Sequence, residues 1–329
     1  MNKIVHFIVH NKVATLVAAL LCACLWFINL STGDVVTIPS CVPIASLSPT
    51  LQLIIAIVSY LMLGLLLIRT NERIAFNIPK KATLAGTLFF MSSALVPYLA
   101  ANITSTVHLV LLSTASYMLL CSYRQHEAMG YYFLSFALVG AASLISPSML
   151  FVAPLLLICC SLLQSLHIRT ILASIFGLLL PYWIVVCGLF LTDTPLPTEA
   201  FVNALIPPAT AQPDIAIYGY TLSAKIPQLA WLILLIVPSI IVTFFSRSAL
   251  KARTQSSLYF LTTAILLMLA CIIIVPGFYP AISPLLFLAL SISASCHFIS
   301  NHHHAAKVYL IVLMIAWLFI ATLSIWSSF

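Results

Sequence analysis

The sequence predicts an all-α fold, a polytopic bundle of transmembrane helices. Of the 329 residues, 63% are hydrophobic and only 6% are charged, whereas soluble domains average roughly 25% charged residues. Apolar segments recur along the whole chain, each matching the ~20 residues that a helix needs to cross the ~30 Å hydrocarbon layer of a bilayer. The few cations fall between these segments. We therefore expect residues 1–329 to form a single integral membrane domain.

These segments are predicted to be helices rather than strands. A helix satisfies its own backbone hydrogen bonds in lipid, and the segments are longer and more uniformly apolar than the ~10-residue alternating strands of an outer-membrane barrel. About eleven helices are expected, at residues 13–30, 51–68, 82–99, 105–121, 130–146, 148–166, 171–192, 228–246, 257–275, 281–298 and 308–327. The connections between them are mostly short, so neighbouring helices should pack as antiparallel hairpins.

The distribution of charge predicts how the bundle sits in a membrane. With the helices as placed above, every lysine and arginine except Lys225 falls on one side. Cytoplasmic loops of membrane proteins carry an excess of these residues. The N-terminus is therefore predicted in the cytoplasm and, because the helix count is odd, the C-terminus in the periplasm.

The longest polar interruption, residues 192–227, is predicted to be a long periplasmic loop. It carries Asp193, Glu199 and Asp214 together with Lys225, and several prolines stiffen it. The first predicted outer loop adds one more acid, Asp34, four residues after the first helix. The outer face is thus acidic where the inner face is basic.

Composition also argues against several function classes. The net charge of +7 resides in short loops between helices, where membrane orientation explains it, so no nucleic-acid partner is expected. All Asp, Glu, Lys and Arg residues fall in loops or at helix ends. Coupled transporters generally bind their ion through charged groups within the bilayer, which places a transporter or flippase third among the candidate functions. GxGxxG, Walker, HExxH and GxSxG motifs are absent, so nucleotide binding, zinc proteolysis and serine hydrolysis have no support.

Histidines give two further expectations. His108 is the one imidazole predicted at depth, and hydrogen bonding to a neighbouring helix is favoured over a proton relay. His302, His303 and His304 form a run on the predicted cytoplasmic side. Successive helical residues point ~100° apart, and no cysteine or carboxylate lies near enough to complete a metal shell. A solvated basic turn is favoured there, with weak metal binding as the alternative, and no metal site is predicted.

The candidate functional residues are Asp34 and Asp193 as catalytic groups and Lys225 as the group that binds phosphate. All three are expected near the lipid headgroups on the outer face. A carboxylate there could act as a general base towards an acceptor hydroxyl or coordinate a divalent cation, and an ammonium could hold a phosphate. The alternative is that these residues only solvate their loops.

One stretch, Ala141–Leu191, resembles known sequences. It has a Ser146-Pro147 turn, a helix with a central Pro154, a short inner turn with Arg169, and then Gly177 and Pro181-Tyr182. This order resembles an uncharacterised family of multi-pass inner-membrane proteins typical of the Bacteroidota. The resemblance implies a multi-pass protein of the bacterial inner membrane and names no activity.

The same stretch is more distantly similar to the middle helices of GT-C glycosyltransferases, which take sugars from polyprenyl-phosphate carriers at the outer face. That resemblance implies an acid just beyond the first helix, and Asp34 occupies this place. The chain departs from the family in a short first outer loop, residues 31–50, and in a second outer loop, residues 100–104, that has no acid.

Taken together, these features favour a role in envelope biogenesis at the outer leaflet, in which GT-C-like glycosyl transfer would use a polyprenyl-phosphate-linked donor. The first alternative is a non-catalytic scaffold or assembly subunit that packs against other membrane proteins through its helices. Membrane lipids, and polyprenyl phosphate among them, are the expected partners.

Overall fold

The computed structural model describes residues 11–32, 49–73, 83–95, 103–125, 127–192, 205, 222–245, 252–274, 279–300 and 304–326. Within these ranges it contains eleven α-helices and no strand, so the predicted all-α fold is confirmed. The helices are α2 (Lys12–Thr32), α3 (Pro49–Arg73), α4 (Leu84–Ala94), α6 (Ile103–Cys121), α7 (Met129–Ile145), α8 (Val152–Cys160), α9 (Ile168–Leu191), α11 (Leu222–Phe245), α12 (Ala252–Ile274), α13 (Tyr279–Ser300) and α14 (His304–Trp326). Short 3₁₀ turns, Pro147–Phe151 and Ser161–Leu163, flank α8.

Five of the described helices are long and apolar enough to cross a membrane. These spans are Thr50–Leu67, Ile103–Cys121, Ile168–Leu191, Ala252–Ile274 and Ile282–Ile299. Shorter apolar helices make up the rest of the bundle. The expectation of a membrane protein with several transmembrane helices agrees with this architecture.

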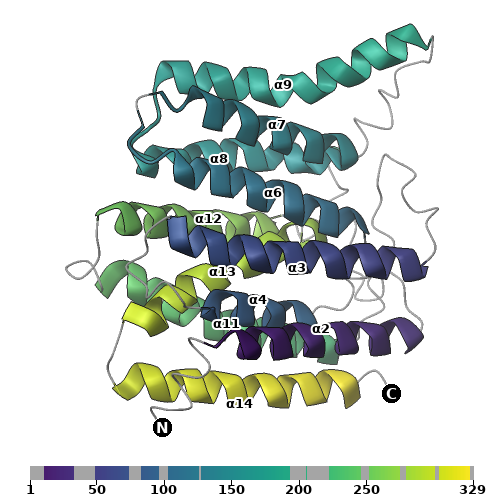
Figure 1. The fold of residues 1–329 in the computed structure, drawn as a ribbon, viewed down its shortest axis with the longest axis vertical. Coiled ribbons are helices and arrows are strands. Elements are labelled where there is room, and N and C mark those ends of the chain that lie inside the picture. Colours follow the sequence, from purple (N-terminus) through teal and green to yellow (C-terminus); the bar gives the residue numbers. More distant parts are fainter. Residues whose placement is uncertain are drawn as a thin grey trace.

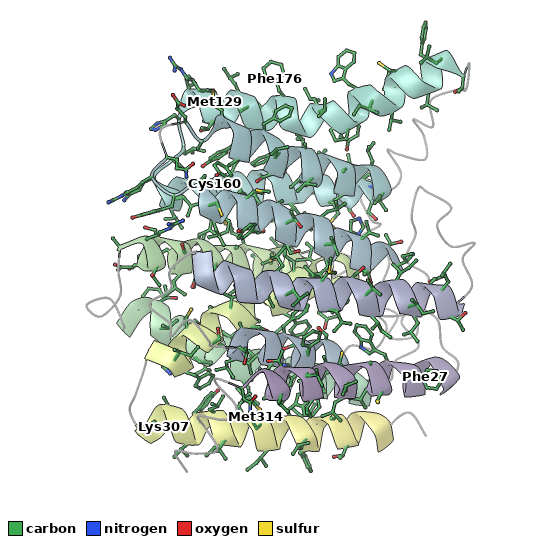
Figure 2. All side chains as sticks on the ribbon, viewed as in Figure 1. Phe27, Met129, Cys160, Phe176, Lys307 and Met314 are labelled. Carbon is green, nitrogen blue, oxygen red and sulfur yellow. The ribbon has the colours of Figure 1, made fainter. Side chains whose placement is uncertain are left out.

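The helices lie side by side along one common direction and alternate in sense along the chain (Figure 1). Helices α2, α4, α7, α9, α12 and α14 begin at one end of the bundle, and α3, α6, α8, α11 and α13 begin at the other. We call the first the Arg124 end, after the turn that follows α6, and the second the Lys225 end, after the residue in the first turn of α11. Figure 2 shows Met129 and Lys307 at the Arg124 end and Phe27 towards the other.

The described helix termini reproduce the predicted asymmetry of positive charge. At the Arg124 end lie the helix termini or turns that carry Lys12, Arg69, Arg73, Arg124, Arg169, Arg253 and Lys307. In the described part of the chain, Lys225 is the one cation at the opposite end. In the described residues, the gathering of cations at one end is therefore a property of the folded bundle as well as of the sequence.

Helix α13 forms the centre of the bundle. It contacts α4, α6, α11, α12 and α14, and 94% of its apolar span is buried. Its many serines bond to the neighbouring turns or helices; for example, Ser293 donates to the hydroxyl of Ser239 on α11 at 2.7 Å. Small residues allow helix backbones to approach closely in lipid, which explains why this helix can be surrounded on all sides.

Helix α4 ends early, and tryptophans cap it. The Nε1–H groups of Trp317, Trp231 and Trp26 donate to the carbonyl of Met91, the hydroxyl of Ser92 and the carbonyl of Ser93, at 2.7, 2.9 and 3.1 Å. The last carbonyls of a helix have no partner within the helix. Proline at position 97 carries no N–H, so even a longer helix could not have satisfied the carbonyl of residue 93. Three helices, α2, α11 and α14, thereby converge on one turn of α4.

Helices α7 and α9 pack closely against each other. A Cβ atom added at Gly177 would overlap the carbonyl oxygen of Phe133, and one added at Gly140 would come within 2.5 Å of the carbonyl oxygen of Leu178. The hydroxyl groups of Ser143 and Tyr182 share a hydrogen bond of 2.7 Å further along the same interface. The contacts advance in the same sense along both helices, so α7 and α9 are parallel.

Some boundaries differ from those predicted. Helix α11 begins at Leu222, six residues before the predicted start at 228, so the predicted loop 192–227 ends in helix. Helix α12 begins at Ala252 rather than at 257. The sequence did not predict these helix starts, because apolar residues mark a membrane segment and the first turns of both helices contain polar residues.

Candidate functional site

The residues predicted to act lie at or beyond the edge of what the structure describes. Asp34 and Asp193 are outside the described residues, as are His302 and His303. Lys225 lies in the first turn of α11, and His304 begins α14, but their side chains are outside the described part. The catalytic and phosphate-binding roles given to Asp34, Asp193 and Lys225 therefore stay predictions.

His108 does what the sequence predicted for a histidine at depth. Its side chain is 1% exposed, and Nε2 lies 3.1 Å from the carbonyl oxygen of Ala142 on α7. Because a carbonyl only accepts, Nε2 carries the proton and donates it. The bond ties α6 to α7 in the half of the bundle nearer the Lys225 end. His108 is thus accounted for as a helix-to-helix contact.

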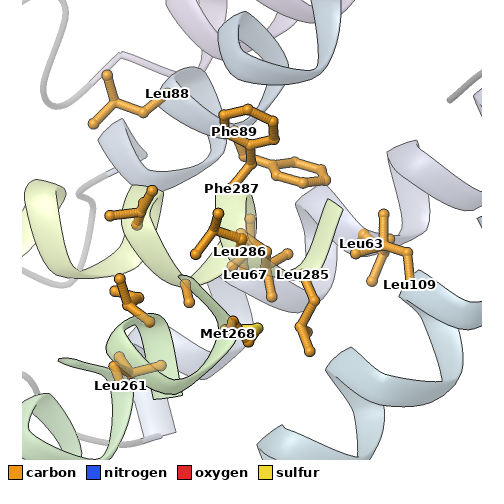
Figure 3. Packing of buried hydrophobic residues seen from close by; sticks show 14 of the residues in the cluster. Leu63, Leu67, Leu88, Phe89, Leu109, Leu261, Met268, Leu285, Leu286 and Phe287 are labelled. Carbon is orange, nitrogen blue, oxygen red and sulfur yellow. The ribbon is translucent and has the colours of Figure 1, made fainter. Parts of the chain in front are cut away.

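The candidate site that the structure adds is an apolar cavity of about 50 Å³ between α3, α6, α8, α12 and α13. Its walls are mainly aliphatic: Leu66 and Leu67 of α3, Leu120 of α6, Val152, Leu155 and Leu156 of α8, Leu261, Ala264 and Met268 of α12, and Leu285, Leu288, Ala289 and Ile292 of α13. Figure 3 shows Leu67, Met268 and Leu285, from three different helices, gathered around one part of the core. Cys159 and Phe260 complete the apolar wall.

One side of the cavity is polar. Ser113, Ser116 and Tyr117, all on α6, are the hydroxyl-bearing residues that line it. The hydroxyl of Ser113 donates to the carbonyl of Val110 at 3.1 Å. The hydroxyls of Ser116 and Tyr117 make no hydrogen bond to any residue that the structure describes.

The lining limits the chemistry of this cavity. None of the described residues that form it is Asp, Glu, Lys, Arg or His, so these walls offer no acid–base pair. The described residues as a whole contain no group of three side chains able to hold a metal ion. An apolar cavity of this kind does not hold water readily, and its volume is several times the ~10–15 Å³ that one water requires. It suits a segment of hydrocarbon.

The turns at the Arg124 end, after α6 and before α9, are tied together by hydrogen bonds. The hydroxyl of Ser165 lies 3.1 Å from that of Ser122 and 3.0 Å from that of Tyr132. Arg124 and Gln164 both have positive φ, 53° and 55°, and Nε of Arg124 donates to the side-chain oxygen of Gln164 at 2.9 Å. The two turns therefore form one hydrogen-bonded unit at the Arg124 end of the bundle.

Sequence reasoning did not find the cavity, because leucine, valine and methionine line cavities and fill cores alike. The only available signals were the small residues Ala264 and Ala289 among larger neighbours and the serines and tyrosine on one turn of α6. Neither signal distinguishes an empty space from close packing.

Comparison of the chain with protein-family models, with curated proteins and with solved structures found no match in any of the three.

Proposed function

We propose that this chain is a multi-pass protein of the bacterial inner membrane that acts in envelope biogenesis on a lipid-linked substrate. The observation that carries the proposal is the cavity between α3, α6, α8, α12 and α13, which is lined almost wholly by apolar side chains. In a bundle whose helices match the thickness of a bilayer, such a space fits a hydrocarbon chain better than an ion or a polar solute. A lipid-linked substrate supplies such a chain.

The chemical step that we propose is glycosyl transfer at the periplasmic face, as in GT-C enzymes. Asp34 would act as the general base that takes the proton of an acceptor hydroxyl, whose oxygen forms a bond to the anomeric carbon of the sugar as the bond from that carbon to the polyprenyl phosphate breaks. Lys225 would hold the departing phosphate, and Asp193 would be a second carboxylate. In this arrangement the Lys225 end of the bundle faces the periplasm and the Arg124 end faces the cytoplasm. Ion-coupled transport ranks lower, because the cavity walls carry no charge to bind a coupling ion.

Filling the cavity tests the proposal. Ala264→Phe places a phenyl ring at the cavity wall, whereas Ala270→Phe, on the same helix, places it on the exposed face. Native mass spectrometry of protein purified from membranes should show retained lipid in the parent and in Ala270→Phe, and roughly tenfold less in Ala264→Phe. A parent protein that retains no lipid, or equal retention in both variants, would contradict the proposal.

The glycosyl-transfer step has its own test. In proteoliposomes supplied with a polyprenyl-phosphate-linked sugar, Asp34→Asn should abolish transfer and leave lipid retention unchanged, while Asp214→Asn serves as the loop control. Transfer by Asp34→Asn at the parent rate would remove Asp34 from the mechanism.

A second candidate function, a non-catalytic scaffold, is favoured by α9. Only 11% of its apolar span is buried within the chain, which leaves Phe176, Trp183 and Phe190 among its exposed side chains. Such a helix could pack against another membrane protein. The scaffold would tolerate Asp34→Asn and Ala264→Phe and would co-purify with a partner at a fixed ratio, whereas an enzyme would lose activity in both.

A further inference from the structure

The cavity carries more information than its apolarity, because two hydroxyl groups in its wall have no described partner. Ser116 and Tyr117 are both partly exposed, and neither hydroxyl bonds to another described residue. Serine and threonine hydroxyls within a helix usually bond to a carbonyl of the preceding turn. Ser113 and Thr114, on the same helix, do so: both bond to the carbonyl of Val110, at 3.1 and 2.7 Å.

We infer that this cavity binds an acyl chain and that Ser116 and Tyr117 donate hydrogen bonds to its ester or carboxyl carbonyl. The remaining wall is hydrocarbon from α3, α8, α12 and α13, which matches the methylene chain next to that carbonyl. A polyprenyl chain has no carbonyl and would leave both hydroxyls without a partner in a water-poor place, which costs free energy. The hydroxyls therefore select an acylated lipid over an isoprenoid.

The depth of the two hydroxyls agrees with this assignment. Tyr117 lies four residues before α6 ends at Cys121, which is about 6 Å along the axis at 1.5 Å per residue. The ester carbonyls of a phospholipid lie just inside the headgroups, at the border of the hydrocarbon layer. Arg124, in the turn that follows α6, is exposed and stands on the headgroup side of that border. An acylated lipid with its headgroup at the Arg124 end fits this order of groups.

This inference rests on the proposed function only in its claim that the bundle binds a lipid. It does not need Asp34, Asp193 or glycosyl transfer, because the hydroxyls lie towards the end of the bundle opposite Lys225. Under this inference the cavity holds an acylated membrane lipid, and the polyprenyl-phosphate donor of the proposed glycosyl transfer does not occupy it.

The test uses the full-length protein in detergent and a phosphatidylethanolamine whose acyl chain carries a diazirine. After illumination, peptides that contain Met268 or Leu285 should be the main sites of cross-linking, since both residues line the cavity. Ser116→Ala and Tyr117→Phe should each lower this cross-linking by roughly threefold, as expected for one lost hydrogen bond. Thr114→Ala, on the same helix, is the control, because its hydroxyl bonds to the carbonyl of Val110 and the residue does not line the cavity, so cross-linking should be unchanged.

Competition with unlabelled lipids identifies the kind of lipid that binds in the cavity. Unlabelled dioleoyl phosphatidylethanolamine and oleic acid supply the ester and free-acid forms of the carbonyl, and whichever competes better identifies the form bound. Undecaprenyl phosphate should compete poorly with both. Equal cross-linking in Tyr117→Phe, Ser116→Ala and the parent, or stronger competition by undecaprenyl phosphate, would overturn the acyl assignment while leaving a lipid-binding function in place. No cross-linking of the parent protein at the cavity would overturn both.

Discussion

Helices α9 and α13 are similarly apolar, yet they occupy opposite environments. Their spans have mean hydropathies of 2.2 and 1.8, but 11% of the first and 94% of the second are buried. In water the apolar face of a helix would decide which side is buried. In lipid the hydrocarbon tails are as apolar as leucine, so apolarity alone gives no preference. The pair shows that other residues decide burial in this bundle.

Small and hydroxyl-bearing residues make that decision. Helix α13 carries buried Ser283, Ser291, Ser293 and Ser295 and is surrounded. Helix α9 has small or hydroxyl-bearing residues along one narrow stripe, and its fully buried positions, Thr170, Ser174 and Gly177, all fall on it. Most of its leucine side chains, and its phenylalanine and tryptophan side chains, are exposed. Figure 1 shows the consequence, with α9 at the edge of the bundle and bending along its length.

The largest effect is expected where the stripe on α9 allows no added atom. Gly177→Leu should separate α9 from α7, because its Cβ would overlap the carbonyl of Phe133 and backbone cannot yield cheaply. We expect a loss of stability of about 3 kcal/mol, the upper end of the usual cost of overpacking, measured as thermal unfolding in detergent.

Gly188→Leu, on the same helix, is the matched control, because a Cβ there meets no atom within 4 Å. Helix propensity should then leave its stability equal to the parent or slightly higher. Equal destabilisation by the two substitutions would contradict the account of the α7–α9 contact.

An intermediate effect is expected at the capped end of α4. Trp26→Phe keeps an aromatic ring in contact with Tyr60. It removes the N–H group that donates to the carbonyl of Ser93. An unsatisfied buried carbonyl costs about 1–3 kcal/mol. Trp183→Phe, at a position 64% exposed on α9, should change the unfolding temperature little. A stable Trp26→Phe would mean that the cap is dispensable.

The smallest effect is expected inside α13. Ser293→Ala removes the bond to the hydroxyl of Ser239, and hydrogen bonds between helices in lipid average roughly 0.6 kcal/mol. Thr322→Ala, at an exposed position on α14 whose hydroxyl bonds only to its own helix, is the control. Because one bond is small, the useful measurement is a double-mutant cycle between Ser293 and Ser239, and a coupling of zero would contradict the account.

The sequence was sufficient to predict the helices, because length and apolarity mark a membrane segment directly. Each of the eleven predicted segments corresponds to a described helix, and the histidine predicted to bond a neighbouring helix, His108, does so. The sequence did not predict which helices contact one another. Nothing in the residues of α4 indicates that tryptophans of α2, α11 and α14 will meet at one turn, since those partners come from distant parts of the chain.

The candidate site likewise has residues that the sequence predicted and features that only the structure shows. Asp34, Asp193 and Lys225 were chosen for their chemistry and their predicted side of the membrane, and the structure does not describe their side chains. The cavity was not predicted, because a cavity is a mismatch of shapes among five helices and has no residue type of its own. The free hydroxyls of Ser116 and Tyr117 could be recognised only once the bonds of Ser113 and Thr114 were known.

The contrast between α9 and α13 can be measured without any substitution. A small membrane-soluble diazirine reagent, activated in proteoliposomes and followed by peptide mass spectrometry, inserts into side chains that face lipid. Peptides of α9 should be labelled heavily around Phe176 and Trp183, and the stretch of α13 between Ser293 and Ile299, which is buried and does not line the cavity, should be labelled at least tenfold less. Comparable labelling of the two helices would contradict the arrangement with α13 at the centre and α9 at the lipid-facing edge.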